Sequence, residues 1–134
     1  MKIVFLNIRL IIIFLILGSI NVYSQCDTCN STTTFYVDLS MSPDSTWISP
    51  DTDRNGECCG NTGTRCLRFI VTTHPGTDQI AFNIATPPIP PGQFYQYECG
   101  PYISAGEPLC ATGTGPHCIV YCKPGSDLSQ YSIT

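Results

Sequence analysis

Cysteine offers the most chemistry in this sequence. The chain has nine cysteines among its 134 residues. They are Cys26, Cys29, Cys58, Cys59, Cys66, Cys99, Cys110, Cys118 and Cys122. Thiols at this density form disulfide bonds in an oxidising compartment, or metal and redox sites in a reducing one. The compartment in which the chain folds therefore decides what the cysteines do.

Residues 1–24 are typical of a secretory signal peptide. Lys2 and Arg9 supply a positive start, residues 10–17 are continuously apolar, and residues 22–24 end in a small-residue cleavage pattern. The apolar run is too short for a membrane helix, which needs about 20 apolar residues. We therefore expect a secreted or cell-surface protein with disulfide bonds and no membrane span after cleavage.

The odd number of cysteines leaves one without an intrachain partner. That cysteine is free, pairs with another chain, or pairs with sequence beyond Thr134. The connectivity cannot be deduced from spacing. Cys58 and Cys59 are adjacent, and we expect two different partners for them because a bridge between neighbours is strained. Cys66 follows a short Gly-rich turn and is a natural partner for one of the two.

The remaining cysteines offer further hypotheses. Cys26 and Cys29 form a C-x-x-C pair, which is a redox motif when it opens a helix after a strand. No helix pattern follows it, so we interpret the pair as structural. Cys110 and Cys118 flank a loop of Gly, Thr and Pro, which would suit a bridge. Zinc binding is disfavoured by the export signal and the irregular spacing.

One short string could hold a hard cation. Asp51, Asp53 and Asn55 place oxygen ligands at alternate positions before Gly56, as at the start of a calcium loop. The twelfth position of such a loop needs a bidentate Glu, and Thr62 stands there. The string is therefore not an EF-hand, and we prefer an acidic surface turn to a looser calcium site. No other cofactor is expected.

Aromatic side chains could bind a sugar. Trp47, Tyr95, Tyr97, Tyr102 and Tyr121 are the candidates, because a flat exposed ring can stack on a sugar ring. Tyrosine at alternate strand positions more often packs inside the protein, and the sequence does not show which rings are exposed.

Other activities have little support. His74 and His117 lie beside prolines, and no Gly-x-Ser-x-Gly motif accompanies them, so we expect no enzyme and no catalytic residues. The net charge is −4. A nucleic-acid partner is not expected either, because the cations after the signal peptide are few and scattered. They are Arg54, Arg65, Arg68 and Lys123.

Alternating hydrophobicity predicts about seven short strands. They cover residues 33–39, 47–48, 66–73, 79–85, 93–99, 118–122 and 130–134. No helical period is visible, and the chain is rich in turn formers, with 11 Gly and 11 Pro. We predict an all-β fold, namely a single antiparallel β-sandwich, immunoglobulin-like or jelly-roll, with long loops tied by disulfide bonds.

The domain organisation follows from these segments. Residues 1–24 are the signal peptide, residues 25–46 carry the C-x-x-C pair and the first strand, and residues 47–134 form the cysteine-rich sandwich. The last strand ends without a closing turn. We expect this chain to be the N-terminal piece of a longer protein.

Several short strings together resemble a known family. They are residues 58–60 (Cys-Cys-Gly), 65–69, 82–84, 90–92, 94–96, 99–101, 115–118 and 121–125. They resemble the cysteine-rich N-terminal module of very large surface or secreted proteins of gliding Bacteroidetes. The resemblance covers residues 47–134. It implies export, a type IX secretion route, and a role in adhesion or surface structure, with PKD-like repeats and a gliding-motility-associated sorting domain further along the chain.

Three functional hypotheses follow. The first is a non-catalytic exported module of an adhesin-like surface or secreted protein, which binds an extracellular glycan or protein through loops at one end of the sandwich. The second is a carbohydrate-binding module of a secreted degradative enzyme. A small secreted hydrolase or a redox protein that uses Cys26 and Cys29 is a less favoured third.

Overall fold

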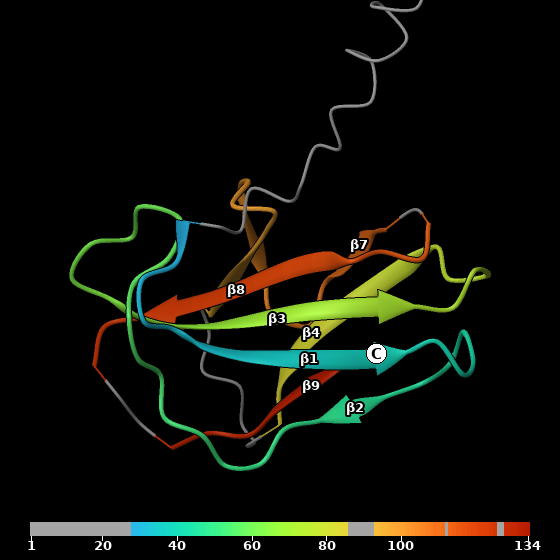
Figure 1. The fold of residues 1–134 in the computed structure, drawn as a ribbon, viewed down its shortest axis with the longest axis horizontal. Helices are drawn as coiled ribbons and strands as arrows, with labels where there is room; N and C mark the ends of the chain where they lie inside the picture. The colour runs from blue at the N-terminus through green and yellow to red at the C-terminus, as the bar shows by residue number, and fades with distance from the viewer. Residues whose placement is uncertain (1–27, 86–92, 112, 126–127) are drawn as a thin grey trace, which may run out of the picture.

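The computed structural model describes residues 28–85, 93–111, 113–125 and 128–134. Nine strands lie in these residues: β1 (Thr33–Leu39), β2 (Trp47–Ile48), β3 (Arg65–Thr73), β4 (Gln79–Ile84), β5 (Phe94–Tyr97), β6 (Tyr102–Ser104), β7 (Pro108–Cys110), β8 (His117–Lys123) and β9 (Tyr131–Ile133). They form a five-stranded sheet, β1-β3-β8-β5-β6, and a four-stranded sheet, β2-β9-β4-β7 (Figure 1). The signal peptide and Cys26 fall outside the described residues.

The main core lies between the two sheets. Leu67, Phe69 and Val71 alternate along β3 and are fully buried, as their spacing predicts. Phe82 of β4 is at the centre of an aromatic cluster, with its ring centroid 5.4 Å from that of Phe69. Tyr95, Tyr121 and Tyr131 complete the cluster.

A second, smaller core covers the outer face of the five-stranded sheet. Cys66, Cys118 and Val120 alternate with the main-core residues of β3 and β8, so their side chains point to the opposite face. Cys58, from the long β2–β3 connection, packs on them and is fully buried. Figure 1 shows this connection (green) passing around the end of the sandwich where β3 begins and β8 ends. The sandwich therefore carries a third, cysteine-rich layer.

The predicted all-β, disulfide-stabilised sandwich is confirmed. The structure has two more strands than expected, because β6 and β7 lie in the segment predicted as a loop between residues 100 and 116. Each has three residues, which is too short for alternation to show. The β1–β3 pair is parallel, whereas every other pairing between the described strands is antiparallel.

The part of the chain with described coordinates contains no helix whose length and apolar character would let it cross a membrane.

Candidate functional site

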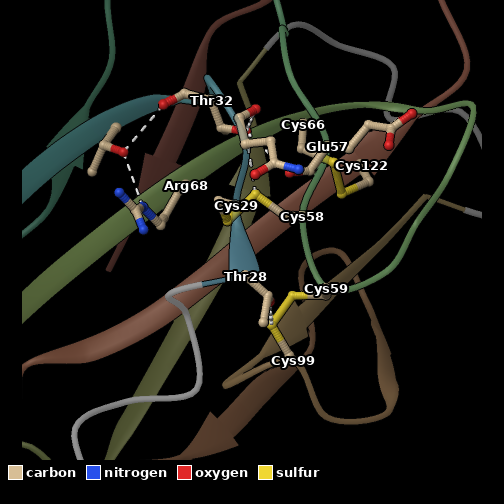
Figure 2. The surroundings of a disulfide bond; sticks show 12 residues. Thr28, Cys29, Thr32, Glu57, Cys58, Cys59, Cys66, Arg68, Cys99 and Cys122 are labelled. Carbon is tan, nitrogen blue, oxygen red and sulfur yellow. Dashed lines mark hydrogen bonds between the residues drawn. A yellow bond between two sulfur atoms is a disulfide. The ribbon is translucent and has the colours of Figure 1, made fainter.

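Three disulfide bonds lie in and beside the third layer, as Figure 2 shows. They are Cys29–Cys58, Cys59–Cys99 and Cys66–Cys122. Cys118 is also disulfide-bonded. Cys110, exposed on β7, is the free cysteine among the described residues. This bonding indicates an oxidising environment.

The pairing confirms one expectation and corrects two others. Cys58 and Cys59 have different partners, as their adjacency predicts. Cys66 does not pair with either, because the β3–β8 register places it directly opposite Cys122. The suggested bridge across the loop before β8 is wrong as well, since Cys110 is free while Cys118 is bonded.

The C-x-x-C pair is not a dithiol in this structure, because Cys29 is bonded to Cys58. Next to this bridge, Asn30 and Glu57 exchange two backbone hydrogen bonds of 2.8 and 3.3 Å. The bridge and this short ladder hold the start of the described chain against the β2–β3 connection, which is the structural role that we expected of Cys29.

The Cys59–Cys99 bridge joins the loop of residues 58–64 to the β5–β6 hairpin. A side-chain network runs beside it. The Asn61 carboxamide donates to Gln96 Oε1 at 2.6 Å and accepts from the Tyr102 hydroxyl at 2.5 Å. Gln96 in turn donates to the Gly100 carbonyl oxygen at 2.9 Å. Two segments that are distant in sequence are thus linked by one covalent bond and two hydrogen bonds, and the third hydrogen bond lies within the hairpin.

Two aromatic rings are exposed on this hairpin. Tyr102 is 61% exposed and Phe94 is 45% exposed. Their centroids are 6.5 Å apart in an edge-to-face arrangement. We call Phe94 and Tyr102 the aromatic platform. The network described above fixes the Tyr102 ring although most of its surface is in water.

The other aromatic candidates are less accessible. Trp47 packs partly buried against Phe35 and Phe69, at centroid distances of 5.4 and 6.0 Å. Tyr95 is fully buried, and its hydroxyl donates to a backbone carbonyl. Tyr97 lies half-buried against His117. Of the candidate sugar-binding residues, Tyr102 alone is exposed.

Phe94 was missed in the sequence reasoning. It opens β5 one residue before the buried Tyr95, so alternation alone would have placed it on the outer face. Its pairing with Tyr102 depends on the β5–β6 hairpin, which the sequence did not reveal.

His117 has partners for both ring nitrogens inside the fold. Nε2 lies 3.2 Å from the Gly113 carbonyl oxygen and 3.3 Å from Thr73 Oγ1, and Nδ1 lies 2.9 Å from the Tyr97 hydroxyl. A carbonyl can only accept, so the geometry assigns the proton to Nε2 and makes Nδ1 the acceptor from Tyr97. His74 accepts from the Gly76 amide in its turn. Both histidines therefore stabilise the loops in which they make these hydrogen bonds.

Two tyrosines with raised pKa values make the folded state less stable at high pH. Burial, with a smaller contribution from Glu107, raises the pKa of Tyr95 to about 12, and burial with Glu98 raises the pKa of Tyr97. In the unfolded chain they ionise near pH 10. The contribution of these two tyrosines to stability is therefore constant below about pH 10, and it becomes increasingly unfavourable as the pH rises towards 12. Urea midpoints measured at pH 8 and pH 11 should show this loss, and Tyr95→Phe should flatten the dependence. An unchanged slope in Tyr95→Phe would contradict the assignment.

Two residues of the acidic string pair with distant segments. Thr52 forms an isolated bridge with Ser129, and Asn55 forms one with Cys66. The Asn55 carboxamide oxygen already accepts from the Thr33 amide at 2.6 Å. No group of three or more His, Cys, Asp or Glu residues that could hold a metal occurs in the described segments.

Comparisons with protein families, with curated proteins and with solved structures found no match. The case for a function rests on the fold and on its exposed chemistry. In that respect the aromatic platform, held by Cys59–Cys99 and Asn61, is the most distinctive feature of the surface.

Proposed function

We propose that this chain is an exported, non-catalytic module of an adhesin-like surface or secreted protein, and that it binds an extracellular ligand through the aromatic platform. The sequence pattern of residues 1–24 and the disulfide bonds support export. The observation that carries the binding role is the pair of exposed rings, Phe94 and Tyr102, on a hairpin held to a neighbouring loop. The likeness to surface proteins of gliding Bacteroidetes fits this role.

A rigid exposed tyrosine suits binding better than a mobile one. Ordering a flexible side chain at an interface costs about 0.5–1.5 kcal/mol. The Asn61–Tyr102 hydrogen bond and the contact with Phe94 restrict the Tyr102 ring before any ligand arrives. Tyrosine and other rigid aromatics supply large contact area at low entropy cost, which is why they dominate binding surfaces.

A carbohydrate is the ligand that this chemistry favours. Phe94, Tyr102 and the residues whose side chains fix Tyr102, Asn61 and Gln96, are all uncharged. Aromatic faces flanked by neutral polar groups match the apolar face and hydroxyl rim of a sugar ring. The second candidate function is therefore a carbohydrate-binding module of a secreted degradative enzyme.

Binding of the oxidised, secreted chain to a glycan array tests the proposal. We expect Tyr102→Ala and Phe94→Ala each to lower the affinity for any bound glycan about tenfold or more, in line with the loss of an aromatic anchor. Tyr36→Ala is the matched control, because Tyr36 is 80% exposed but lies on β1, at the opposite edge of the five-stranded sheet.

Equal losses for Tyr36→Ala and Tyr102→Ala would remove the platform as the binding site. Binding to no glycan but to an extracellular protein, with loss in Tyr102→Ala, would keep the platform and replace the carbohydrate. Thermal unfolding of each variant should match the parent, since both platform rings are largely outside the core.

A further inference from the structure

The Cys59–Cys99 bridge differs from the other disulfide bonds in its exposure. Both of its cysteines are half-buried. The bridges of Cys58, Cys66 and Cys118 each contain a cysteine with no exposed surface. Thiol–disulfide exchange requires a thiolate to approach a sulfur atom directly, so access decides which bridge reacts first.

Both cysteines of this bridge lie in tight turns of the backbone. Cys59 has a φ of 55° and Cys99 a φ of 54°, and Glu98 beside it has a φ of 51°. Residues other than glycine adopt this left-handed region infrequently, because their Cβ atom crowds the backbone there. No other cysteine of the described residues has a positive φ. Glu98 and Cys99 are the central residues of a tight turn that the Gly100 amide closes on the Tyr97 carbonyl oxygen, and Cys59 and Gly60 are those of a second turn that the Asn61 amide closes on the Cys58 carbonyl oxygen. Both turns can persist without the bridge, so access to the sulfur atoms, and not backbone strain, makes this bridge the easier one to reduce.

The consequences of opening would stay local. The two ends of the loop remain held, because Cys58 is bonded to Cys29 and Cys66 to Cys122 (Figure 2). Within the loop, the Asn61 amide donates to the Cys58 carbonyl and the Gly63 amide to a Glu57 carboxylate oxygen. These bonds do not reach the hairpin.

The tie to the platform would weaken. Once the bridge is open, the Asn61 carboxamide is the main described link between this loop and the β5–β6 hairpin, through Gln96 and Tyr102. Asn61 lies two residues from Cys59, so the covalent bond now limits how far its carboxamide can move from Tyr102. Loss of that limit frees the Tyr102 ring and raises the entropy cost of binding.

We propose that Cys59–Cys99 is a thiol–disulfide exchange site that controls the aromatic platform, with extracellular dithiols as its reactant class. A dithiol thiolate attacks one bridge sulfur, the S–S bond breaks, and a mixed disulfide forms. The second thiol of the reagent, as a thiolate, then attacks the reagent sulfur of the mixed disulfide and displaces the protein thiolate, so the reagent leaves as a cyclic disulfide and the protein keeps two thiols. The protein bridge gains two electrons and two protons, and the dithiol loses them. The control of binding rests on the proposed function, whereas the selective reduction does not.

Dithiothreitol titration of the oxidised secreted chain tests the exchange site. Aliquots are alkylated and the modified peptides are identified by mass spectrometry. We expect Cys59 and Cys99 to be alkylated about tenfold faster than Cys66 and Cys122, because both sulfur atoms of their bridge are in partly exposed residues. Reduction of Cys66–Cys122 first, or of all bridges in one step with unfolding, would overturn the proposal.

Hydrogen exchange tests the effect on the platform without any ligand. In the partly reduced protein and in a Cys59→Ser/Cys99→Ser double variant, amides of residues 59–64 should exchange about tenfold faster while β3 and β8 stay protected. Asn61→Ala, which keeps the bridge, serves as the second variant and should mobilise the β5–β6 hairpin to a smaller extent. Unchanged protection of the loop in all three samples would refute the control of the platform.

Ligand binding separates the two proposals. If Tyr102→Ala abolishes binding and selective reduction weakens it, both stand. If reduction is selective and the loop loosens but no ligand depends on Tyr102, the exchange site stands and the proposed binding function fails. If binding depends on Tyr102 but is the same after selective reduction, the binding function stands and the control fails.

Discussion

Gly56→Ala should destabilise the protein by about 3–5 kcal/mol, among the largest effects of any single methyl group in this chain. Gly56 has a φ of 66°, and a Cβ there would lie 2.1 Å from the Asn30 carbonyl oxygen and 2.5 Å from Thr32 Oγ1. The Asn30 backbone cannot move away from the added Cβ without breaking its two hydrogen bonds with Glu57, which lie beside the Cys29–Cys58 bridge. Urea unfolding of the oxidised protein, followed through the fluorescence of Trp47, which packs partly buried against the core, measures the loss.

Gly60→Ala is the matched control for this substitution. Gly60 has a φ of 73°, yet a Cβ there would have no neighbour within 4 Å. It therefore reports the cost of the left-handed backbone alone, about 1 kcal/mol. Equal destabilisation by the two variants would show that the close approach at Gly56 contributes nothing.

Arg54→Ala should cost a similar amount, about 3–5 kcal/mol. Arg54 is only 1% exposed. Its Nη1 donates to the Tyr131 hydroxyl and its Nη2 to the Gly125 carbonyl oxygen, each at 3.1 Å, and its guanidinium lies 5.6 Å from the centroid of the Tyr121 ring. Truncation leaves both acceptors without this donor inside the protein, and it leaves a cavity.

Arg65→Ala provides the comparison for Arg54. Arg65 is exposed at the start of β3, and its loss should change the free energy of unfolding by no more than about 0.5 kcal/mol. Urea unfolding of both variants gives the two values. A loss below about 1 kcal/mol for Arg54→Ala would mean that water replaces the guanidinium, and that the β2–β3 connection is held by its disulfide bonds alone.

Arg54 also shows where sequence reasoning reached its limit. In the sequence it sits inside an acidic, turn-like string between Asp53 and Asn55, which favours an exposed loop. In the structure Thr52 and Asn55 of that string pair with Ser129 and Cys66, and Arg54 is buried between two exposed neighbours. Asp51 and Asp53 face water and Arg54 faces the core. Local composition carries no information about this, because the partners are far along the chain.

The aromatic platform illustrates the same limit. The sequence nominates Tyr95, Tyr97 and Tyr102 equally, since all are tyrosines near strands. Only the tertiary structure buries Tyr95 under the second sheet, sets Tyr97 against His117, and exposes Tyr102 beside Phe94. Exposure depends on which face of a strand meets another layer, and a single strand of three residues does not encode that.

The sequence by itself determined the all-β class, the core-facing residues of β3 and β4, the oxidised cysteines and the separate partners of Cys58 and Cys59. These follow from local rules, namely the two-residue period of a strand and the strained geometry of a bridge between neighbours. The tertiary structure decided the parallel β1–β3 pair, the third layer and the identity of each bridge, such as Cys66–Cys122 across 56 residues. The physical reason is that pairing depends on the free energy of contacts between distant segments, which no local pattern contains.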